Sequence, residues 1–286
     1  MKVLGIDGGG SKTTFLMVDG DREVARLETG PSNYISVGKE ASRKAIQEGI
    51  RGMPSQPEVI CGGFAGAGQE VGRAYYHETL QSLLPESRVL IETDAFIAYI
   101  GAAGIRPGVL LIAGTGAIVV GRREDGTTFR AGGWGPQFGD DGGGFWIGRE
   151  AIQVSLRSVD FGSNARFRNH IAEALGLGSI EAAVTAWADG KLTVPDVAAL
   201  FPIIAEYYPH EPAKAILEEA AKHLRVLTQR SVAALGADAP YTTASGGVAL
   251  HPLMQELISL PFEPPIDTPE KGAVLWAMGQ GSGRSG

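Results

Sequence analysis

Apolar residues in the first half of the chain occur in short runs that end in glycine-rich turns. Two such runs, residues 3–6 and 15–18, flank the polar segment Asp7–Thr14, which contains three consecutive glycines. Asp19-Gly20 closes the second run, and this dipeptide beside apolar residues is a strong hairpin signal. The pattern predicts two strands joined by a glycine turn, with a third strand at residues 22–27.

Further apolar runs alternate with segments of helical periodicity up to residue 103. The pattern predicts strands at residues 59–64 and 89–91, and helices at residues 39–51, 70–84 and 95–103. The resulting order is βββαβαβα. We therefore expect an α/β fold in which a mixed sheet carries helices on its faces.

The second half of the chain repeats this opening. Strands are expected at residues 109–113, 118–121 and 127–131, with Gly114-Thr115-Gly116 as the first turn. One offset of 106 residues superposes Ile6 on Ile112, Gly8 on Gly114, Gly10 on Gly116, Asp19 on Asp125 and Gly20 on Gly126. A shared offset across two turns predicts duplicated halves. In a weaker match, residues 61–63 align with residues 245–247.

Residues 145–235 are mostly helical in periodicity, with helical apolar spacing at residues 151–159, 167–175, 180–188 and 213–235. A last helix is expected near residues 270–278. We predict a first domain at residues 1–107, completed by a helix at about 269–280. The second domain then spans residues 108–268 and contains a helical insertion that serves as a dimer surface. Residues 281–286 are expected to form a flexible tail.

Composition excludes several classes of protein. The net charge of −7 argues against a general nucleic-acid binder, which needs a basic face. Cys61 is the single cysteine, so neither a disulfide framework nor a cysteine-ligated cluster within one chain is expected. The five histidines lack metal-ligand spacing. Because no leader or membrane-spanning run is visible, we expect a soluble cytoplasmic protein.

The first glycine turn is the best candidate for chemistry. Glycines let phosphate oxygens approach bare backbone N–H groups, whose dipoles attract anions. Asp7, at the end of the strand before the turn, is placed to hold Mg²⁺ directly or through water. A glycine turn without any ligand is the alternative, because a glycine loop alone is weak evidence.

With two such hairpins, the chain resembles the superfamily of sugar kinases, actin and heat-shock chaperone ATPases. The five matching segments are residues 4–13 and 110–122 for phosphate, 243–248 for adenosine, and the connecting segments 60–68 and 272–277. The resemblance implies actin-like, ribonuclease H-like halves that face an ATP cleft. Within the superfamily, the run Gly132–Gly148 is similar to the marker of the N-acetylglucosamine kinase branch of the BadF/BadG/BcrA/BcrD type.

This resemblance implies a role for each matching residue. Asp94 matches the catalytic aspartate, which takes the proton from the sugar hydroxyl as it attacks the γ-phosphate of ATP. The implied phosphate and adenosine contacts are Gly9, Gly10, Ser11, Lys12, Thr13, Gly114, Thr115, Gly116, Gly246 and Gly247. The implied sugar contacts are Asn33, Asp94, Ala117, Trp134, Gly135 and Asp140.

Each of these assignments has a plain structural alternative. Asp94 could be the N-cap of the following helix. Asp140-Asp141 could be a solvated acidic turn, and Trp134 could be core packing. Two departures from the family pattern, Ala117 in place of serine and Asp141 in place of glutamate, put the identity of the hexose in doubt but not the fold.

We therefore expect an ATP- and Mg²⁺-dependent kinase of an amino sugar. The first expectation is phosphorylation of N-acetylglucosamine at its 6-hydroxyl by a homodimer, with glucosamine or N-acetylmuramic acid as alternative substrates. A different class is an ATPase activator of a partner enzyme, which would need cysteines from two subunits around one iron–sulfur cluster. Cys61 alone argues against that class. A sugar-binding regulator is a third hypothesis, but no DNA-binding segment is evident.

Overall fold

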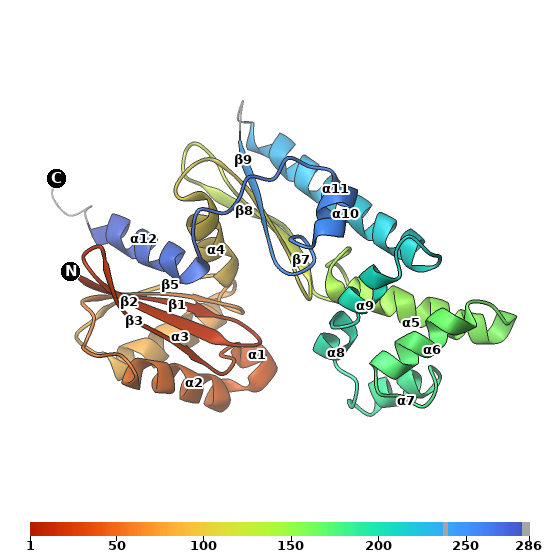
Figure 1. Cartoon of the computed structure of the whole chain (residues 1–286). Helices are drawn as coiled ribbons and strands as arrows, with labels where there is room; N and C mark the ends of the chain where they lie inside the picture. The colour runs from red at the N-terminus through yellow and green to blue at the C-terminus, as the bar shows by residue number, and fades with distance from the viewer. Residues whose placement is uncertain (237–239, 282–286) are drawn as a thin grey trace. The chain divides into compact units, whose positions relative to one another are not determined.

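A computed structural model describes residues 1–236 and 240–281. The chain divides into two compact units. Unit 1 comprises Met1–Arg106 together with the described residues from Pro264 onward, and unit 2 comprises Pro107–Glu263. Figure 1 shows the C-terminal helix α12 beside the N-terminal sheet of unit 1.

Unit 1 is built on a five-stranded mixed sheet. Its central strand β1 pairs antiparallel with β2 and parallel with β4, as expected from a hairpin followed by a helical crossover. The order across the sheet is β3-β2-β1-β4-β5. The strands are β1 (Lys2–Gly8), β2 (Thr13–Asp19), β3 (Arg22–Thr29), β4 (Val59–Phe64) and β5 (Arg88–Glu92).

Alternation along β1 divides the helices of unit 1 between the two faces of the sheet. Leu4 and Ile6 belong to a buried cluster with Ile46 and Leu80. Gly5 points to the other face, where a Cβ atom would lie 2.3 Å from the Glu270 carbonyl. The helices are α1 (Tyr34–Val37), α2 (Lys39–Arg51), α3 (Glu70–Leu83), α4 (Asp94–Ala103) and α12 (Pro269–Gly281).

Residues 264–268 belong with unit 1, which corrects the expectation that the second domain extends to residue 268. The N–H groups of Ile266 and Asp267 donate to the carbonyls of Ala102 and Gly101, at 2.9 and 3.0 Å. These bonds fasten the segment to the end of α4. The expected tail at residues 281–286 lies, apart from Gly281, outside the described residues.

Unit 2 repeats the strand order of unit 1 in a four-stranded sheet, β8-β7-β6-β9. The mixed α/β fold predicted for both halves is therefore confirmed. In place of the fifth strand expected from βββαβαβα, unit 2 has one isolated bridge between Thr243 and Glu263. The strands are β6 (Gly108–Ala113), β7 (Ala117–Arg122), β8 (Thr128–Gly132) and β9 (Tyr241–Ser245).

The helices between β8 and β9 form the predicted helical insertion. Helices α5, α6, α7 and α10 lie where the sequence predicted helical segments. The short helices α8, α9 and α11 were not predicted individually. All three of these short helices carry proline in their first turn. The helices are α5 (Gly144–Phe161), α6 (Ala165–Ala174), α7 (Ala182–Ala188), α8 (Val194–Ala198), α9 (Phe201–Glu206), α10 (Ala213–Leu235) and α11 (Pro252–Ile258).

The strand pairing shows that the two hairpins of the predicted repeat differ in the length of their turns. Ile6 pairs with Phe15, whereas Ile112 pairs with Ile118, so the second strands of the two hairpins are related by 103 residues and not by 106. The turn after β7 is correspondingly longer than the turn after β2, which restores the 106-residue offset at Asp125. The 106-residue offset therefore relates the first strands and the turns that follow the second strands, whereas the second strands themselves are related by 103 residues.

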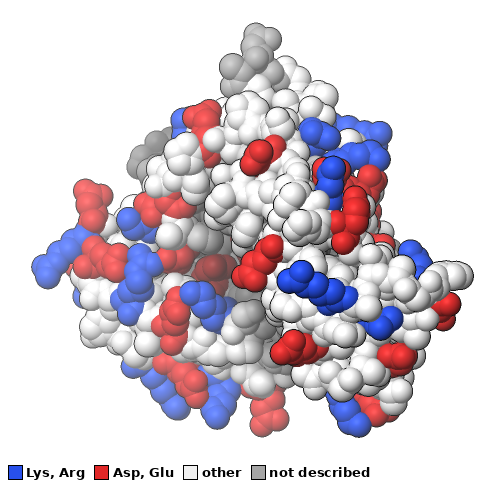
Figure 2. All heavy atoms as spheres, turned by 45° about the vertical axis from the view of Figure 1, so that its right-hand side comes forward, with Lys and Arg blue, Asp and Glu red and all other residues white. Residues whose placement is uncertain are grey.

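Acidic and basic side chains are interspersed over the face shown in Figure 2. Among the described residues, no helix is both long and apolar enough to cross a membrane.

Candidate active site

The turn of the first hairpin spans residues 9–12, between the paired residues Gly8 and Thr13. The Gly9 carbonyl accepts the N–H groups of Ser32 and Asn33, at 3.1 and 3.2 Å. These bonds bring Asn33, a predicted sugar contact, to the predicted phosphate contacts. The Asn33 Oδ1 atom itself accepts the N–H of Ile35 (3.1 Å) and caps α1, which leaves the side-chain amide nitrogen for a ligand.

The tip of this turn is open to solvent. Gly10, Ser11 and Lys12 are exposed, and no atom lies within 4 Å of where a Cβ of Gly10 would be. Thr13 differs, because its buried hydroxyl lies 2.8 Å from both the Gly30 carbonyl and the Ser32 hydroxyl. The Thr13 side chain therefore braces the loop that carries Asn33.

The two candidate acids of unit 1 lie at the carboxyl ends of neighbouring strands. Asp7 pairs with Gly63 of β4, which in turn pairs with Glu92 at the end of β5. Asp94 follows Glu92 by two residues. Because adjacent strands lie about 4.8 Å apart, Glu92 is roughly two strand spacings from Asp7. The Asp94 carboxyl is near enough to Asp7 for its charge to raise the pKa of Asp7.

Asp94 is the first residue of α4 but is not its cap. The cap is Thr93, whose hydroxyl oxygen accepts the N–H of Phe96 at 3.1 Å. Asp94 is half-buried, and desolvation raises the pKa of its carboxyl, an effect that the nearby N–H of Ala95 partly offsets. Thr93 therefore performs the N-capping role that the sequence offered as the alternative for Asp94.

The pKa of the Asp7 carboxyl is strongly raised by its surroundings. Burial, followed by the negative charges of Asp94 and Glu270, raises the pKa of Asp7 to about 7, and the Lys12 ammonium acts in the opposite direction. A buried carboxyl group with a second carboxyl group, that of Asp94, nearby is an environment in which a cation binds favourably. Carboxylate oxygens are also the donors that Mg²⁺ prefers, so the residues present fit that ion.

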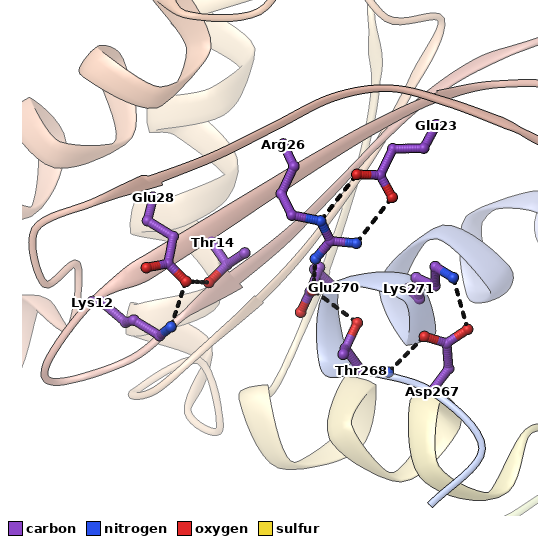
Figure 3. A network of polar contacts seen from close by, with 9 residues as sticks. All are labelled: Lys12, Thr14, Glu23, Arg26, Glu28, Asp267, Thr268, Glu270 and Lys271. Atoms are coloured by element: carbon purple, nitrogen blue, oxygen red, sulfur yellow. Dashed lines mark hydrogen bonds and ion pairs between the residues drawn. The ribbon is translucent and has the colours of Figure 1, made fainter.

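Glu270 is a functional candidate that the sequence did not reveal. Its side chain is only 6% exposed, and it forms an ion pair with Arg26 of β3 and accepts the Thr268 hydroxyl at 2.7 Å. Figure 3 shows this cluster, together with the separate pair of Lys12 and Glu28 on the first hairpin. No local pattern could indicate Glu270, because Arg26 lies 244 positions away in sequence.

The turn of the second hairpin is held against the start of α5. The carbonyls of Gly114 and Thr115 accept the N–H groups of Gly144 and Phe145, at 2.7 and 2.9 Å. Gly246, which has φ +92°, packs so closely on this hairpin that a Cβ would lie 2.4 Å from the Ala113 carbonyl. The structure thus brings the predicted residues Gly114–Gly116 and Gly246 together, and Gly247 is exposed beside them.

Asp140 joins the same hairpin to the glycine-rich run. Its carboxylate lies so close to Gly116 that a Cβ there would be 2.4 Å from Asp140 Oδ2, and Oδ1 accepts the Gly135 N–H at 3.2 Å. Asp140 is half-buried with φ +59°, and burial raises the pKa of its carboxyl. Asp141 is exposed. The carboxylate of Asp140 therefore orders the loop and is not part of a freely solvated turn.

Trp134 is 67% exposed, which excludes core packing within unit 2 as its role. The Arg130 guanidinium lies 4.2 Å from the centre of its ring, and Arg130 Nη1 also donates to the carbonyls of Gly132 and Gly133. These contacts hold an apolar plane open to solvent. Ala117, in contrast, is buried in the core of unit 2, so only its backbone could contact a sugar.

Comparison with known proteins identifies the family. The model of the BadF/BadG/BcrA/BcrD ATPase family matches residues 4–277. The chain belongs to this family.

Similar members of the family include two curated kinases. An N-acetylmuramic acid/N-acetylglucosamine kinase of Clostridium acetobutylicum is 34% identical over 78% of this chain and 76% of the relative. An N-acetyl-D-glucosamine kinase of Dictyostelium discoideum is 32% identical over 90% of this chain and 88% of the relative.

A solved structure from Chromobacterium violaceum, a candidate N-acetylglucosamine kinase, superposes with a TM-score of 0.79 at 25% identity. The superposition covers 96% of this chain and 98% of that chain. The fold is thus that of the actin-like sugar kinases.

Cys61 bears on the alternative of an ATPase activator with a shared iron–sulfur cluster. The residue lies in β4 with no exposed surface, and burial raises the pKa of its thiol far above the ordinary value. A buried thiol in the centre of a sheet cannot reach a cluster shared with a second subunit. Among the described residues, no group of three or more His, Cys, Asp or Glu side chains could hold a metal ion.

Proposed function

We propose that this member of the BadF/BadG/BcrA/BcrD ATPase family transfers the γ-phosphoryl group of ATP to a hydroxyl of an amino sugar. N-acetylglucosamine is the first candidate, with N-acetylglucosamine 6-phosphate as the product. The observation that carries the proposal is Asp94, a half-buried acid of raised pKa whose expected capping duty is performed by Thr93. The names of both curated relatives support the class of substrate.

Asp94 would act as the general base. Its carboxylate would accept the proton of the sugar hydroxyl while that oxygen attacks the γ-phosphorus of ATP and the bond to the β-phosphate oxygen breaks. A raised pKa favours proton acceptance near neutral pH. Asn33, Asp140, Gly135 and the ring of Trp134 would orient the sugar.

The two glycine hairpins would contact the phosphates of ATP. In unit 1, the exposed backbone at Gly9–Ser11 and the Lys12 ammonium would receive anionic oxygens. In unit 2, the residues would be Gly114–Gly116, with Gly246 and Gly247 near the adenosine. Asp7 would hold Mg²⁺, directly or through water, and that ion would supply charge stabilisation of the phosphates when bound.

The state of assembly and the location belong to the same proposal. We infer a cytoplasmic homodimer that associates through helices of unit 2. Exposed apolar side chains at the end of α5 support this inference, since Phe161 is 81% exposed and Val159 is 39% exposed. Light scattering of Phe161→Ser against wild type tests the interface, and a wild-type monomer would contradict it.

A coupled assay with a panel of hexosamines tests the catalytic proposal. We expect ATP and Mg²⁺ to be consumed only when a hexosamine is present, with a phosphosugar detected by mass spectrometry. N-acetylglucosamine, glucosamine and N-acetylmuramic acid form the panel. Sugar-independent ATP hydrolysis without any phosphosugar would contradict the kinase assignment.

A further inference from the structure

Tyr76 of α3 is a buried residue to which the proposed reaction gives no role. Its side chain has no exposed surface, and its ring stacks on that of Phe64 with 4.1 Å between the ring centres. The phenol hydroxyl accepts the N–H of Tyr34 at 3.2 Å and lies 2.9 Å from each of two carbonyls, those of Ser32 and Ala65. One side chain of α3 thus joins the loop after β3 to the loop after β4.

These contacts lie on both sides of Asn33, the candidate sugar contact of unit 1. Ser32 and Tyr34 are its two neighbours in the chain, and both are bonded to the Tyr76 hydroxyl. The Asn33 N–H donates to the Gly9 carbonyl at 3.2 Å, and its own carbonyl accepts two N–H groups of α1, at 3.0 and 3.1 Å. The orientation of the Asn33 amide nitrogen therefore depends on how firmly this loop is held.

The Tyr76 hydroxyl also ties this loop to the sheet. A phenol has one proton to donate, and the Ser32 carbonyl already accepts the Ser42 hydroxyl at 2.6 Å. The Tyr76 proton is therefore available for the Ala65 carbonyl. The N–H of Ala65 in turn donates to the carbonyl of the last residue of β1, at 2.9 Å. One hydroxyl thus connects the loop that carries Asn33 to the end of the central strand.

We propose that Tyr76 is a positioning residue for the sugar: its hydroxyl fixes the backbone on both sides of Asn33 and so aims the Asn33 amide nitrogen at the substrate. The inference rests on the proposed function, in which Asn33 contacts the sugar. A side chain without exposed surface cannot touch a ligand, so Tyr76 acts through Asn33. The hydroxyl sets the affinity for the sugar, while other residues hold ATP.

The test begins with Tyr76→Phe, which removes the hydroxyl and keeps the ring that stacks on Phe64. We expect the KM for N-acetylglucosamine to rise about tenfold, as for one hydrogen bond to the sugar that is no longer aligned, while the KM for ATP changes less than about twofold. Calorimetry without nucleotide gives the dissociation constant of the sugar independently of turnover. Tyr75→Phe is the matched control, because that hydroxyl donates to the Lys39 carbonyl at 2.7 Å. Both KM values should then stay as in wild type.

A double-mutant cycle with Asn33→Asp separates positioning from packing. Aspartate keeps an oxygen that can cap α1 but has no N–H group to donate to the sugar. In that background Tyr76→Phe should change the dissociation constant of the sugar by less than about twofold, because the group that it aims is already absent. A purely structural role of Tyr76 would give the same fold-change in both backgrounds. Thermal melting confirms that each variant is folded at the assay temperature.

The outcomes separate this inference from the proposed function. Phosphorylation of N-acetylglucosamine with the same KM in wild type and Tyr76→Phe would overturn the inference and leave the kinase standing. Equal effects of Tyr76→Phe with and without Asn33→Asp would also overturn it. A weaker binding of the sugar by Tyr76→Phe that vanishes in the Asn33→Asp background, without phosphorylation of any sugar, would support the positioning role while contradicting the kinase.

Discussion

The hairpins of the two units have the same strand pairing but different chemistry. In unit 1, Asp7 is the last residue but one of β1, and the turn contains Lys12. In unit 2, the 106-residue offset places Ala113 at the position of Asp7, and the turn 114–116 is neutral. The first turn is held by a loop, and the second by the start of α5. Duplication has therefore kept the backbone geometry in both units and the charged groups in only one.

This difference suggests a division of roles. Unit 1 would supply the charged groups of phosphoryl transfer, while unit 2 would supply neutral backbone donors and the loop that holds the sugar. Four predictions test that division.

The largest effect is expected for Asp94→Asn. Loss of a general base typically costs roughly 10²–10⁴-fold, so turnover should fall by at least about two orders of magnitude. Thermal stability should change little, because Thr93 and not Asp94 caps α4. Turnover and melting temperature are measured on the variant, with the exposed Asp21→Asn as the control. Retention of more than about a tenth of the turnover would make Asp140 the next candidate base.

Asp7→Asn should weaken nucleotide binding and yet stabilise the free protein at high pH. The pKa of Asp7 rises from 3.8 to about 7 on folding. The native state therefore binds the extra proton between these values, and the stability of wild type falls as the pH rises through this range. Above pH 7 the variant should be more stable by about 1–3 kcal/mol, and near pH 4 the two proteins should be equal.

Urea denaturation of both proteins at pH 4 and pH 8, without nucleotide and Mg²⁺, measures this difference. Asp21→Asn again serves as the control. A variant that is less stable than wild type at pH 8 would mean that Asp7 is a stabilising group, and the division of roles would lose its main support in unit 1.

The glycines at equivalent turn positions should respond differently to the same substitution. A methyl group at Gly116 would meet Asp140 Oδ2 at 2.4 Å, whereas nothing lies within 4 Å of that position at Gly10. Gly116→Ala should therefore destabilise the protein by about 1–3 kcal/mol and raise the KM for the sugar by displacing Asp140. Gly10→Ala should be neutral or stabilising in a melting experiment. Equal destabilisation by the two variants would contradict the different packing of the turns.

The sequence predicted the strands and the long helices well, because apolar periodicity depends on residues close together in the chain. Helix α10 has the predicted bounds Ala213–Leu235, and α2 and β4 also agree. The helices α8, α9 and α11 depend on distant packing, such as the contact of Gly148 with the Val197 carbonyl, where a Cβ would lie at 2.1 Å. Periodicity contains no information on such contacts.

The sequence predicted those parts of the candidate site that lie in turns or at the ends of strands. Glycine runs and strand-end acids are visible in the sequence, and so is the run around Trp134. The Arg26–Glu270 pair and the capping of α4 by Thr93 are not visible, because both depend on which side chain reaches a partner in three dimensions. The three-residue difference between the hairpins is also not visible in the shared offset. In unit 2 the turn before the second strand is shorter and the turn after it is longer, so the two changes in length cancel.

The smallest effect on stability is expected for Lys12→Met, and it gives the clearest contrast with unit 2. Lys12 and Glu28 form an ion pair whose side chains are 61% and 54% exposed. Because exposed pairs contribute about 0–1 kcal/mol, the melting temperature should hardly change. The KM for ATP should nevertheless rise several-fold, because the turn loses its charge near the phosphates.

Thr115→Ala, in the second turn, removes an exposed neutral side chain and should leave both the melting temperature and the KM for ATP close to those of wild type. If Thr115→Ala raised the KM for ATP as much as Lys12→Met, the charged groups of unit 1 would not explain phosphate binding, and backbone donors would have to do so in both units.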